Sequence, residues 1–583
     1  MTMTPDGASG AASSAAPASA AAIDDPTAFP ETVGIGAIPT LKRRISWTGA
    51  FWVASGVPPL VLFSIGAVAA VVGKVSWMIW IASVLMGFIQ SFTYAEITGL
   101  FPDKSGGASI YGAIAWFRYS KWLAPVSVWC NWFAWSPVQA IGSGLAAGYI
   151  LNGLFAPDAI INTWQFTLLD LGFIKSGLSL RINATFILGA VILLAVKTIQ
   201  DGGILRSANT TKILGISAMI PLVLIGILPI MTGDVVHANF VPFVPLVHSA
   251  TGLVHDGSWN RVGWTVIAGG MFLAAWSTYG FETAVCYTSE LKNPKTDTFK
   301  AIFYSGLLCV VVYALVPFAF QGYLGVGHLI TPPVLDAQGH VVSPPVYDGM
   351  LSPGIYSGAG VAEVMARMVH AGRIAGAFVV VMLVLALVLA LMTSMAGSSR
   401  TLYQASVEGW LPKYLGKLNH HSAPSNAMLT DLCFNMFLLL MSDYVFVLAA
   451  SNCGYLIFSF MNLNAGWIHR VDRPDQERPW RAPTVLLGAG AVLGFVNIAF
   501  MGMGSNVFGS GTLSTGLIFA ALILPVFFFR HYVQDKGVFP QVMMEHMELD
   551  ANRKPVRRAG VWPYLTLIAA AVLLYVTHRL AAY

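Results

Sequence analysis

Charged residues are scarce in this sequence: Asp, Glu, Lys and Arg make up 10% of it, and hydrophobic residues make up 56%. Soluble globular domains carry about 25% charged and about 45–50% apolar residues. Long apolar runs recur along the chain, and about 20 apolar residues are enough for a helix to cross a bilayer. The composition therefore excludes an ordinary soluble domain and predicts an all-α polytopic membrane protein.

Cysteine is scarce too, and all five cysteines fall inside apolar stretches. They are typical of small core residues rather than of a disulfide framework or a metal cluster. No CxxC, HExxH or P-loop pattern occurs. Because no chemistry-bearing motif is present, we expect no metal site, no cofactor and no enzymatic activity.

The N-terminal segment up to about residue 40 is rich in Ala, Ser, Gly and Pro and has no basic start followed by an apolar core. It is therefore no signal peptide, and we expect 1–45 to be a disordered cytoplasmic tail. A twelve-span domain over 46–532 follows. Residues 533–583 hold a cytoplasmic segment and a thirteenth apolar stretch, which can alternatively lie re-entrant or interfacial.

The apolar runs predict the spans along the chain. The boundary between the ninth and tenth spans is the least marked, because 443–452 holds few polar residues that would signal a turn. The predicted spans are 47–72, 76–98, 123–151, 182–200, 210–232, 263–288, 299–325, 374–397, 426–449, 450–469, 483–504, 512–532 and 561–578.

Positive charge alternates between the connecting segments. With the N-terminus inside, most of the 32 Lys and Arg residues fall on inner segments. Such an asymmetry orients a membrane protein with its basic side in the cytoplasm. The positive net charge thus reports topology rather than nucleic-acid binding. The exceptions on outer segments are Lys74, Lys175, Arg181, Arg261, Arg367, Arg373 and Arg579.

The sixth apolar stretch, Gly263 to Pro294, is interrupted. A cluster of Ser, Thr, Tyr and Gly over 277–280 breaks it, and Glu282 follows at once. Small polar residues and glycine allow a helix to unwind where it lines a cavity, and an ionisable residue at membrane depth marks a site or pathway. The stretch predicts two half-helices around a buried site, unless Glu282 lies near the cytoplasmic end and pairs with a neighbour.

The first span is interrupted in the same way. Ala54 to Pro59 contains two consecutive prolines, which supply no N–H to a helix and disfavour helical geometry at Val57. Spans 1 and 6 are five apart. Interrupted helices at matching positions of two halves indicate an inverted repeat with a shared site; the alternative is two unrelated kinked spans.

Four motifs resemble those of the amino acid–polyamine–organocation (APC) permeases. They occur in the order and on the membrane side expected for that superfamily. Ala275 to Glu282, followed by Ser289 to Pro294 with its E-x-K-N-P pattern, resembles the family's sixth span. The others are Y-A-E…F-P…G-G-x-x-Y over 94–111, S-R-x-L-Y…G-x-L-P over 399–412 and R-P-x-R-x-P over 478–483.

This resemblance implies the leucine-transporter fold. Spans 1–5 and 6–10, about 46–233 and 262–470, would form inverted repeats, with two or three accessory spans after them. It also implies that span 1 amides meet a substrate carboxylate and that span 6 carbonyls meet its amino group, in line with the polarity of helix ends. The corresponding residues are Ser55, Gly56, Val57, Trp276, Ser277, Thr278 and Gly280, with Gln139 as a polar contact from span 3.

The sequence departs from the family at one point. Many members carry G-S-G in span 1, whereas Gly56 is here followed by Val57, Pro58 and Pro59. Prolines remove amides that a carboxylate could use. The departure leaves an amine or another organic solute open as the substrate.

Two residues are candidates for coupling. A carboxyl group at membrane depth, Glu282, can load and release a proton. In sodium-independent APC relatives a lysine near the start of span 5 replaces a sodium ion between spans 1 and 8. By this resemblance Lys212 corresponds to that lysine. Its ammonium group would bridge two parts of the chain: the unwound backbone near Ala54 and Ser55, and the span 8 hydroxyls of Thr393 and Ser394.

The sequence thus predicts a secondary active transporter for amino acids or related amines. It would be proton-coupled or exchanging, sodium-independent, and embedded in the lipid bilayer of the plasma (inner) membrane. The alternatives are a transporter of another organic solute, and a non-transporting membrane sensor or partner subunit. The expected partners are a small-molecule substrate and protons, without nucleic acid.

Overall fold

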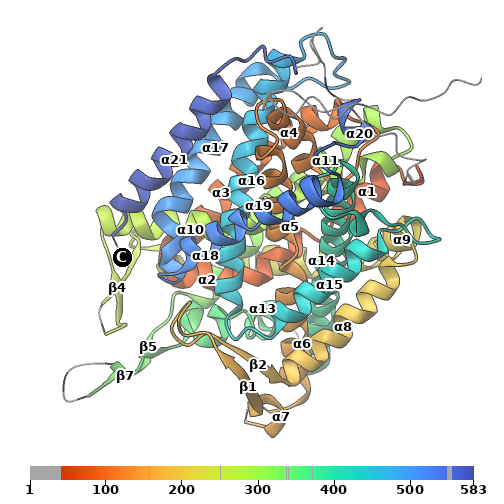
Figure 1. Ribbon diagram of the computed structural model, residues 1–583. Helices are drawn as coiled ribbons and strands as arrows, with labels where there is room; N and C mark the ends of the chain where they lie inside the picture. The colour runs from red at the N-terminus through yellow and green to blue at the C-terminus, as the bar shows by residue number, and fades with distance from the viewer. Residues whose placement is uncertain are drawn as a thin grey trace, which may run out of the picture.

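The computed structural model describes residues 41–582 apart from 157, 250, 337, 339–340, 371, 546 and 548–554. Most of the predicted tail lies outside the described residues. The described chain is mainly helical, and its long helices form a bundle (Figure 1). The helices before residue 233 are α1 (Trp47–Ala54), α2 (Val61–Val72), α3 (Ser76–Gly99), α4 (Ala108–Phe117), α5 (Leu123–Trp135), α6 (Val138–Leu154), α7 (Ile160–Thr163), α8 (Ala184–Gln200) and α9 (Ile204–Thr232), with the 3₁₀ helices η1 (Pro58–Leu60) and η2 (Gly73–Val75).

The remaining helices fall into two groups. Those that continue the bundle are α10 (Arg261–Thr278), η4 (Gly280–Glu290), α11 (Pro294–Leu324), α14 (Arg373–Val407), α15 (Ser425–Leu439) and α16 (Tyr444–Asp472). The C-terminal ones are α17 (Thr484–Gly504), α18 (Thr512–Ala521), α19 (Ile523–Phe528), the π-helix η8 (Phe529–Gln534), α20 (Gln541–Met544) and α21 (Trp562–Leu580). Short 3₁₀ turns are η3 (His237–Phe240), η5 (Gly349–Leu351), η6 (Lys413–Gly416) and η7 (Ser505–Phe508).

Eight helical stretches of the described chain are long and apolar enough to cross a membrane. They make the chain an integral, multi-pass membrane protein. The first, Trp47–Gly99, covers two predicted spans, and α21 is among the eight. The other predicted spans match shorter or interrupted helices, so the full count of spans remains a prediction.

The boundary between the ninth and tenth spans differs from the prediction. Instead of a junction at 449/450, α15 ends at Leu439 and α16 begins at Tyr444. Asp443 determines that start, because its side chain accepts a hydrogen bond from the Phe446 amide at 2.9 Å. A capping carboxylate satisfies a donor that a helix leaves open in its first turn, and the short polar group at 442–443 was its only sequence signal.

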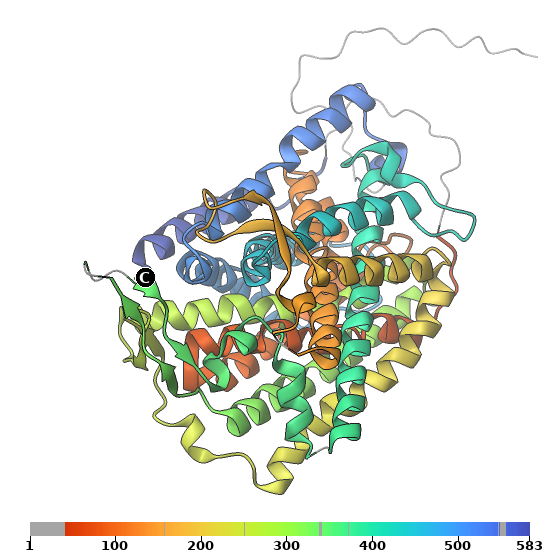
Figure 2. The same ribbon diagram turned by 90° about the horizontal axis from the view of Figure 1, so that it is seen from below.

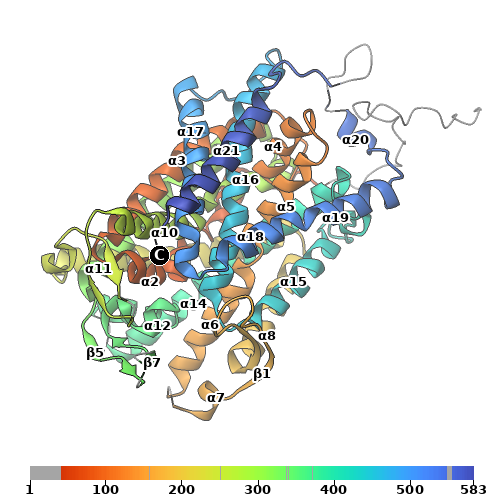
Figure 3. The ribbon, with the colours of Figure 1, turned by 60° about the vertical axis from the view of Figure 1, so that its left-hand side comes forward.

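All strands of the described chain lie in connecting segments at one end of the bundle (Figure 3). Seen from that side, the β1–β2 pair (orange) crosses in front of the helices (Figure 2). Two short helices, α12 (Pro353–Tyr356) and α13 (Val361–Met368), pack against the bundle in the same region. The antiparallel pairs are β1 (Gln165–Asp170) with β2 (Ser179–Asn183), β3 (Leu246–His248) with β4 (Val254–Asp256), β5 (Leu329–Thr331) with β8 (Val346–Tyr347), and β6 (Val334–Leu335) with β7 (Val341–Ser343).

The opposite end is held by ion pairs, and we call it the basic end. There Arg400 binds Glu290, with one N–H···O distance of 3.0 Å, and Lys104 binds Glu408; all four side chains are buried. Glu96 accepts from Arg470 at 2.8 Å. Breaking a buried pair on one side costs about 3–5 kcal/mol, since it leaves a charge without a partner.

These ion pairs connect the sequence motifs to one another. Glu290 belongs to the E-x-K-N-P pattern, Arg400 to S-R-x-L-Y and Glu96 to Y-A-E. Arg478 of R-P-x-R-x-P also lies 3.3 Å from Glu96. Segments that are far apart in sequence are therefore joined at the end of the bundle where the sequence analysis places them together.

Candidate functional site

The first helix is interrupted between α1 and α2. The amide of Gly56 donates to Thr393 Oγ1 of α14 at 3.2 Å instead of to its own helix, and Thr393 Oγ1 donates to the carbonyl of Val53. Pro58 and Pro59 have no N–H to offer. The chain continues through a tight turn, in which Val57 N bonds Ala54 O at 3.2 Å.

The sixth predicted span changes character at the residues that signalled it. The α-helix α10 ends at Thr278, and a 3₁₀ helix, η4, begins at Gly280. Both interruptions are closely packed. A Cβ atom on Gly280 would lie 2.4 Å from the Trp135 ring, and one on Gly56 would lie 2.3 Å from Thr393 Oγ1 and 2.6 Å from Leu389 O.

A single tyrosine hydroxyl connects the two interruptions. Tyr313 of α11 lies with its hydroxyl 2.8 Å from the carbonyl oxygen of Val57 and 2.7 Å from that of Ser277. Its buried ring stacks on Trp80 at 5.6 Å. Sequence analysis missed Tyr313, because a tyrosine within an apolar span carries no charge or break that would single it out.

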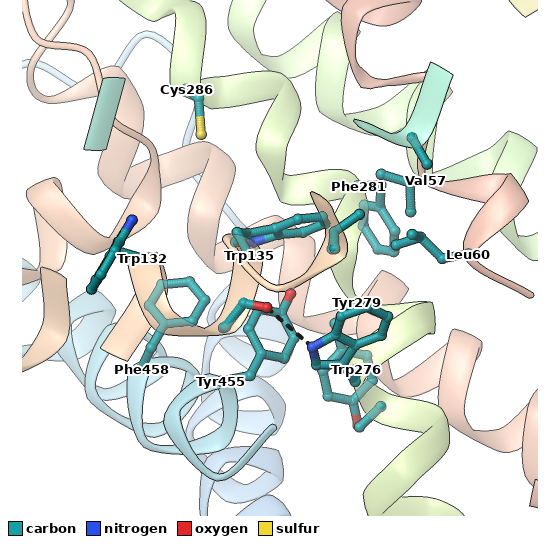
Figure 4. Packing of buried hydrophobic residues seen from close by; sticks show 14 of the residues in the cluster. Val57, Leu60, Trp132, Trp135, Trp276, Tyr279, Phe281, Cys286, Tyr455 and Phe458 are labelled. Carbon is teal, nitrogen blue, oxygen red and sulfur yellow. Dashed lines mark hydrogen bonds between the residues drawn. The ribbon is translucent and has the colours of Figure 1, made fainter. Parts of the chain in front are cut away.

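Aromatic side chains surround the second interruption (Figure 4). Trp135, Trp276, Tyr279 and Tyr455 lie together there, and all are buried. The Trp276 indole donates to the carbonyl of Ala134 at 3.1 Å, so it is anchored to the kink between α5 and α6. Ring faces of this kind attract ammonium groups.

Glu282 lies in this aromatic surrounding and is 3% exposed. Trp135 Nε1 donates to one carboxyl oxygen at 3.0 Å. The other oxygen has no hydrogen-bond partner in the described part of the chain. No basic side chain among the described residues forms an ion pair with Glu282, which is unlike the pairing that the alternative interpretation required.

The remaining span 6 candidates point in different directions. Ser277 Oγ lies 2.8 Å from Ser64 Oγ of α2, and Thr278 Oγ1 lies 2.7 Å from Ser83 Oγ of α3. Their side chains therefore join helices, while the carbonyl of Ser277 faces Tyr313.

Gln139 is turned away from the two interruptions and towards α14 and α15. Its amide nitrogen donates to Ser398 Oγ at 3.3 Å and to the carboxylate of Asp431. Asp431 also accepts from Trp132 at 2.9 Å and from Ser136. Sequence analysis missed this second buried carboxylate, although an aspartate within an apolar span was a usable signal.

The position of Lys212 differs from the prediction. It lies on the exposed side of α9, and no hydrogen bond or ion pair of its side chain occurs among the described residues. Gly215, one turn later, faces the first interruption instead, since its Cβ would lie 2.8 Å from Ser55 Oγ. The hydroxyls of Thr393 and Ser394 donate to the carbonyls of Val53 and Trp135.

Ser55 Oγ donates to Trp52 O at 2.6 Å, next to the bonded amide of Gly56. The structure therefore brings together Gly56, Val57, Ser277 and Gly280 and places Glu282 and Trp276 beside them. Within the described ranges, no group of three or more His, Cys, Asp and Glu side chains is arranged to hold a metal ion.

A bundle of many apolar helices, interrupted where its buried polar groups gather, is typical of membrane transporters. The chain belongs to the amino acid permease family, whose model matches residues 45–528. This confirms the resemblance to APC permeases.

Several relatives are named as transporters. The branched-chain amino acid permease BcaP of Lactococcus lactis subsp. cremoris is 25% identical over 432 residues, covering 73% of this chain and 81% of that protein. The polyamine transporter PUT1 of Oryza sativa subsp. japonica is 23% identical over 468 residues, covering 79% and 73%. The arginine/ornithine antiporter ArcD2 of the same Lactococcus is 25% identical over 277 residues, covering 46% and 50%.

Valine at Gly56 or Gly280 is expected to abolish solute uptake without preventing membrane insertion. The added side chain would force the interruptions apart, and overpacking costs about 1–3 kcal/mol. Gly148→Val in α6 is the control, because a Cβ there meets no atom within 4 Å. Uptake into proteoliposomes measures the effect; normal uptake by both variants would place the site elsewhere.

Tyr313→Phe is expected to lower both stability and uptake. The change leaves buried carbonyls without their shared donor, a loss of about 1–3 kcal/mol. Tyr149→Phe removes a buried hydroxyl that has no partner in the described residues, so it should be nearly neutral. Thermal unfolding in detergent compares the two, and equal midpoints would show that the Tyr313 hydroxyl does not hold the interruptions together.

Proposed function

We propose that this permease is a secondary active transporter that moves amino acids or related amines by alternating access. The observation that carries the proposal is the meeting of two interrupted helices around Gly56 and Gly280, bridged by Tyr313 and bordered by Glu282. Interrupted helices of this kind are what many transporters use to bind solutes near the membrane midplane.

The proposed architecture is a five-plus-five inverted repeat. The halves are about 46–233 and 262–470, and each begins with an interrupted helix of the described chain. The helices after α16 are then accessory. The basic end, where Arg400 and Arg470 lie, faces the cytoplasm of the plasma (inner) membrane, in accordance with the distribution of positive charge.

The site offers more groups that could bind the ammonium group of a substrate than groups that could bind its carboxylate. The amides of Gly56 and Val57 already bond to Thr393 and Ala54, and Pro58 has none. Carbonyls of the second interruption, the aromatic rings and Glu282 all favour a positive charge. Relatives named for branched-chain amino acids, polyamines and arginine or ornithine support a substrate that carries an amino group.

We propose proton coupling or exchange without sodium. Glu282 supplies the proton site, because one of its oxygens is buried without a partner in the described chain. Sodium independence no longer rests on Lys212. It rests on Glu282, whose buried carboxyl group can take up a proton as the coupling ion.

Solute counterflow tests the function. Proteoliposomes holding only this chain are loaded with unlabelled leucine, arginine, ornithine or spermidine and diluted into the same labelled solute. We expect transient accumulation of at least one of them, since exchange across a closed membrane requires alternating access. Accumulation of none would contradict an amino acid or amine transporter; a channel or a sensor would show none.

Glu282→Gln is expected to remove the response of uptake to an imposed pH gradient. Glutamine keeps the size and the hydrogen bond from Trp135 but cannot take up a proton. Counterflow should persist in the variant, whereas accumulation driven by a gradient should fall to the level without a gradient. An unchanged response would assign Glu282 a structural role.

A further inference from the structure

Buried polar side chains form a continuous network between α3, α10, α16 and α17. Tyr279, beside the second interruption, donates from its hydroxyl to Asn497 Oδ1 at 3.0 Å. The Asn497 amide donates to Ser459 Oγ at 3.3 Å, and Ser459 Oγ donates to Gln90 Oε1 at 3.0 Å. The hydroxyl of Tyr94 lies 3.2 Å from Ser459 Oγ. Apart from the ring of Tyr279, the transporter function proposed above does not use these groups.

The network borders several buried polar atoms that have no hydrogen-bond partner in the described chain. They belong to Glu282 (Oε2), Tyr455 (hydroxyl), Gln90 (Nε2) and Thr93 (Oγ1). Buried polar atoms are nearly always hydrogen-bonded, to protein or to ordered water. A row of such atoms along one interface therefore indicates sites at which water molecules bind.

The buried atoms without partners begin at Glu282 and continue to Tyr455 of α16. The Tyr455 hydroxyl adjoins the Glu282 carboxyl without meeting the geometry of a hydrogen bond, and the rings of Tyr455 and Tyr279 lie 6.2 Å apart. The titratable side chains that interact with Glu282 are Tyr94 of α3, Tyr455 of α16, Cys309 of α11 and, in η4 itself, Cys286. None of them is a cation.

The other end of the row reaches the basic end. Gln90, Thr93 and Glu96 follow one another at three-residue intervals on α3, which places them along one side of the helix. Gly466 of α16 and Gly490 of α17 bring both helices close to Thr93, since a Cβ at either would lie within 2.8 Å of its side chain. Glu96 binds Arg470, whose guanidinium also bonds the exposed Thr484.

We propose that this row of residues, from Glu282 through Tyr455, Tyr94, Ser459, Gln90 and Thr93 to Glu96, conducts protons between the site and the basic end. The proposal rests on the proton coupling proposed for Glu282. It separates the path of the proton from that of the solute, because the row runs between α3, α16 and α17 rather than between the interrupted helices. It also assigns a role to α17, an accessory helix, through Asn497.

The transfer changes no bond between heavy atoms. Each hydroxyl of Tyr455, Tyr94 and Ser459 gives its proton to the next acceptor and receives one from the group before it. Water bound at Gln90 and Thr93 does the same, since an amide holds water but does not relay a proton readily. For each proton that enters the row at its Glu96 end, one arrives at the Glu282 carboxylate.

The test separates proton movement from solute exchange. Asn497→Leu and Ser459→Ala are reconstituted with a pH-sensitive dye inside the vesicles, and the solute is the member of the leucine, arginine, ornithine and spermidine panel that shows counterflow. We expect wild-type counterflow in both variants, with proton uptake and gradient-driven accumulation slowed about tenfold or more. The smaller change, Ser459→Ala, keeps the test valid if the leucine variant does not fold.

The matched control is Asn464→Leu. Asn464 of α16 is a second buried asparagine at the contact between α16 and α17, but within the described chain its side chain bonds only Phe460 and Trp467 of its own helix. It should keep proton uptake. Normal proton uptake in Asn497→Leu and Ser459→Ala, or an equal loss in Asn464→Leu, would overturn the path. If the wild-type protein shows counterflow but no response to pH, both the proton coupling and the proton path are wrong, while the transport function is still supported. If the wild-type protein shows no counterflow, the transport function itself is wrong.

Discussion

Inside a membrane, every backbone N–H and C=O must find its partner within the protein, and the rest of this structure follows from that constraint. Where α1 stops, Pro58 and Pro59 remove donors, and the chain requires outside partners. Thr393 supplies one from α14 and Tyr313 supplies another from α11. The polar residues of those two helices are thus explained by a break in a third, and their side chains determine how closely the three helices approach.

The two buried carboxyl groups near the interruptions differ in what surrounds them. Asp431 accepts hydrogen bonds from Trp132 of α5, Ser136 of the kink between α5 and α6, Gln139 of α6 and Ser398 of α14, so both of its oxygens are satisfied. Glu282 receives one, from Trp135. A fully bonded carboxylate holds its helices together and has nothing left to offer a ligand. The group with the open oxygen is the one equipped for transport, and this contrast cannot be deduced from the positions of Asp and Glu in the sequence.

Local signals predicted what is local. Proline or glycine lies where α1 and α10 end, apolar runs coincide with long helices, and residues of all four motifs take part in the ion pairs of the basic end. The predictions went wrong where the outcome depends on distant partners. Lys212 lies on the outer side of α9, and Gln139 turns to Asp431. Tyr313 could not be found, since its importance lies in two carbonyls 256 and 36 residues away.

The family match ends at residue 528, yet the chain beyond it forms hydrogen bonds with α10, the helix that leads to the second interruption. The last carbonyls of a helix have no partner within it. In α21 those of Arg579 and Leu580 accept from Arg261, the first residue of α10, and the amide of Ala582 donates to Thr265 Oγ1. At its other end, Ala559 donates to Asp472, the last residue of α16. The C-terminal helix therefore links the far ends of α10 and α16, the two helices whose inner parts enclose Glu282, so the geometry around that carboxyl depends on a segment that lies outside the family match.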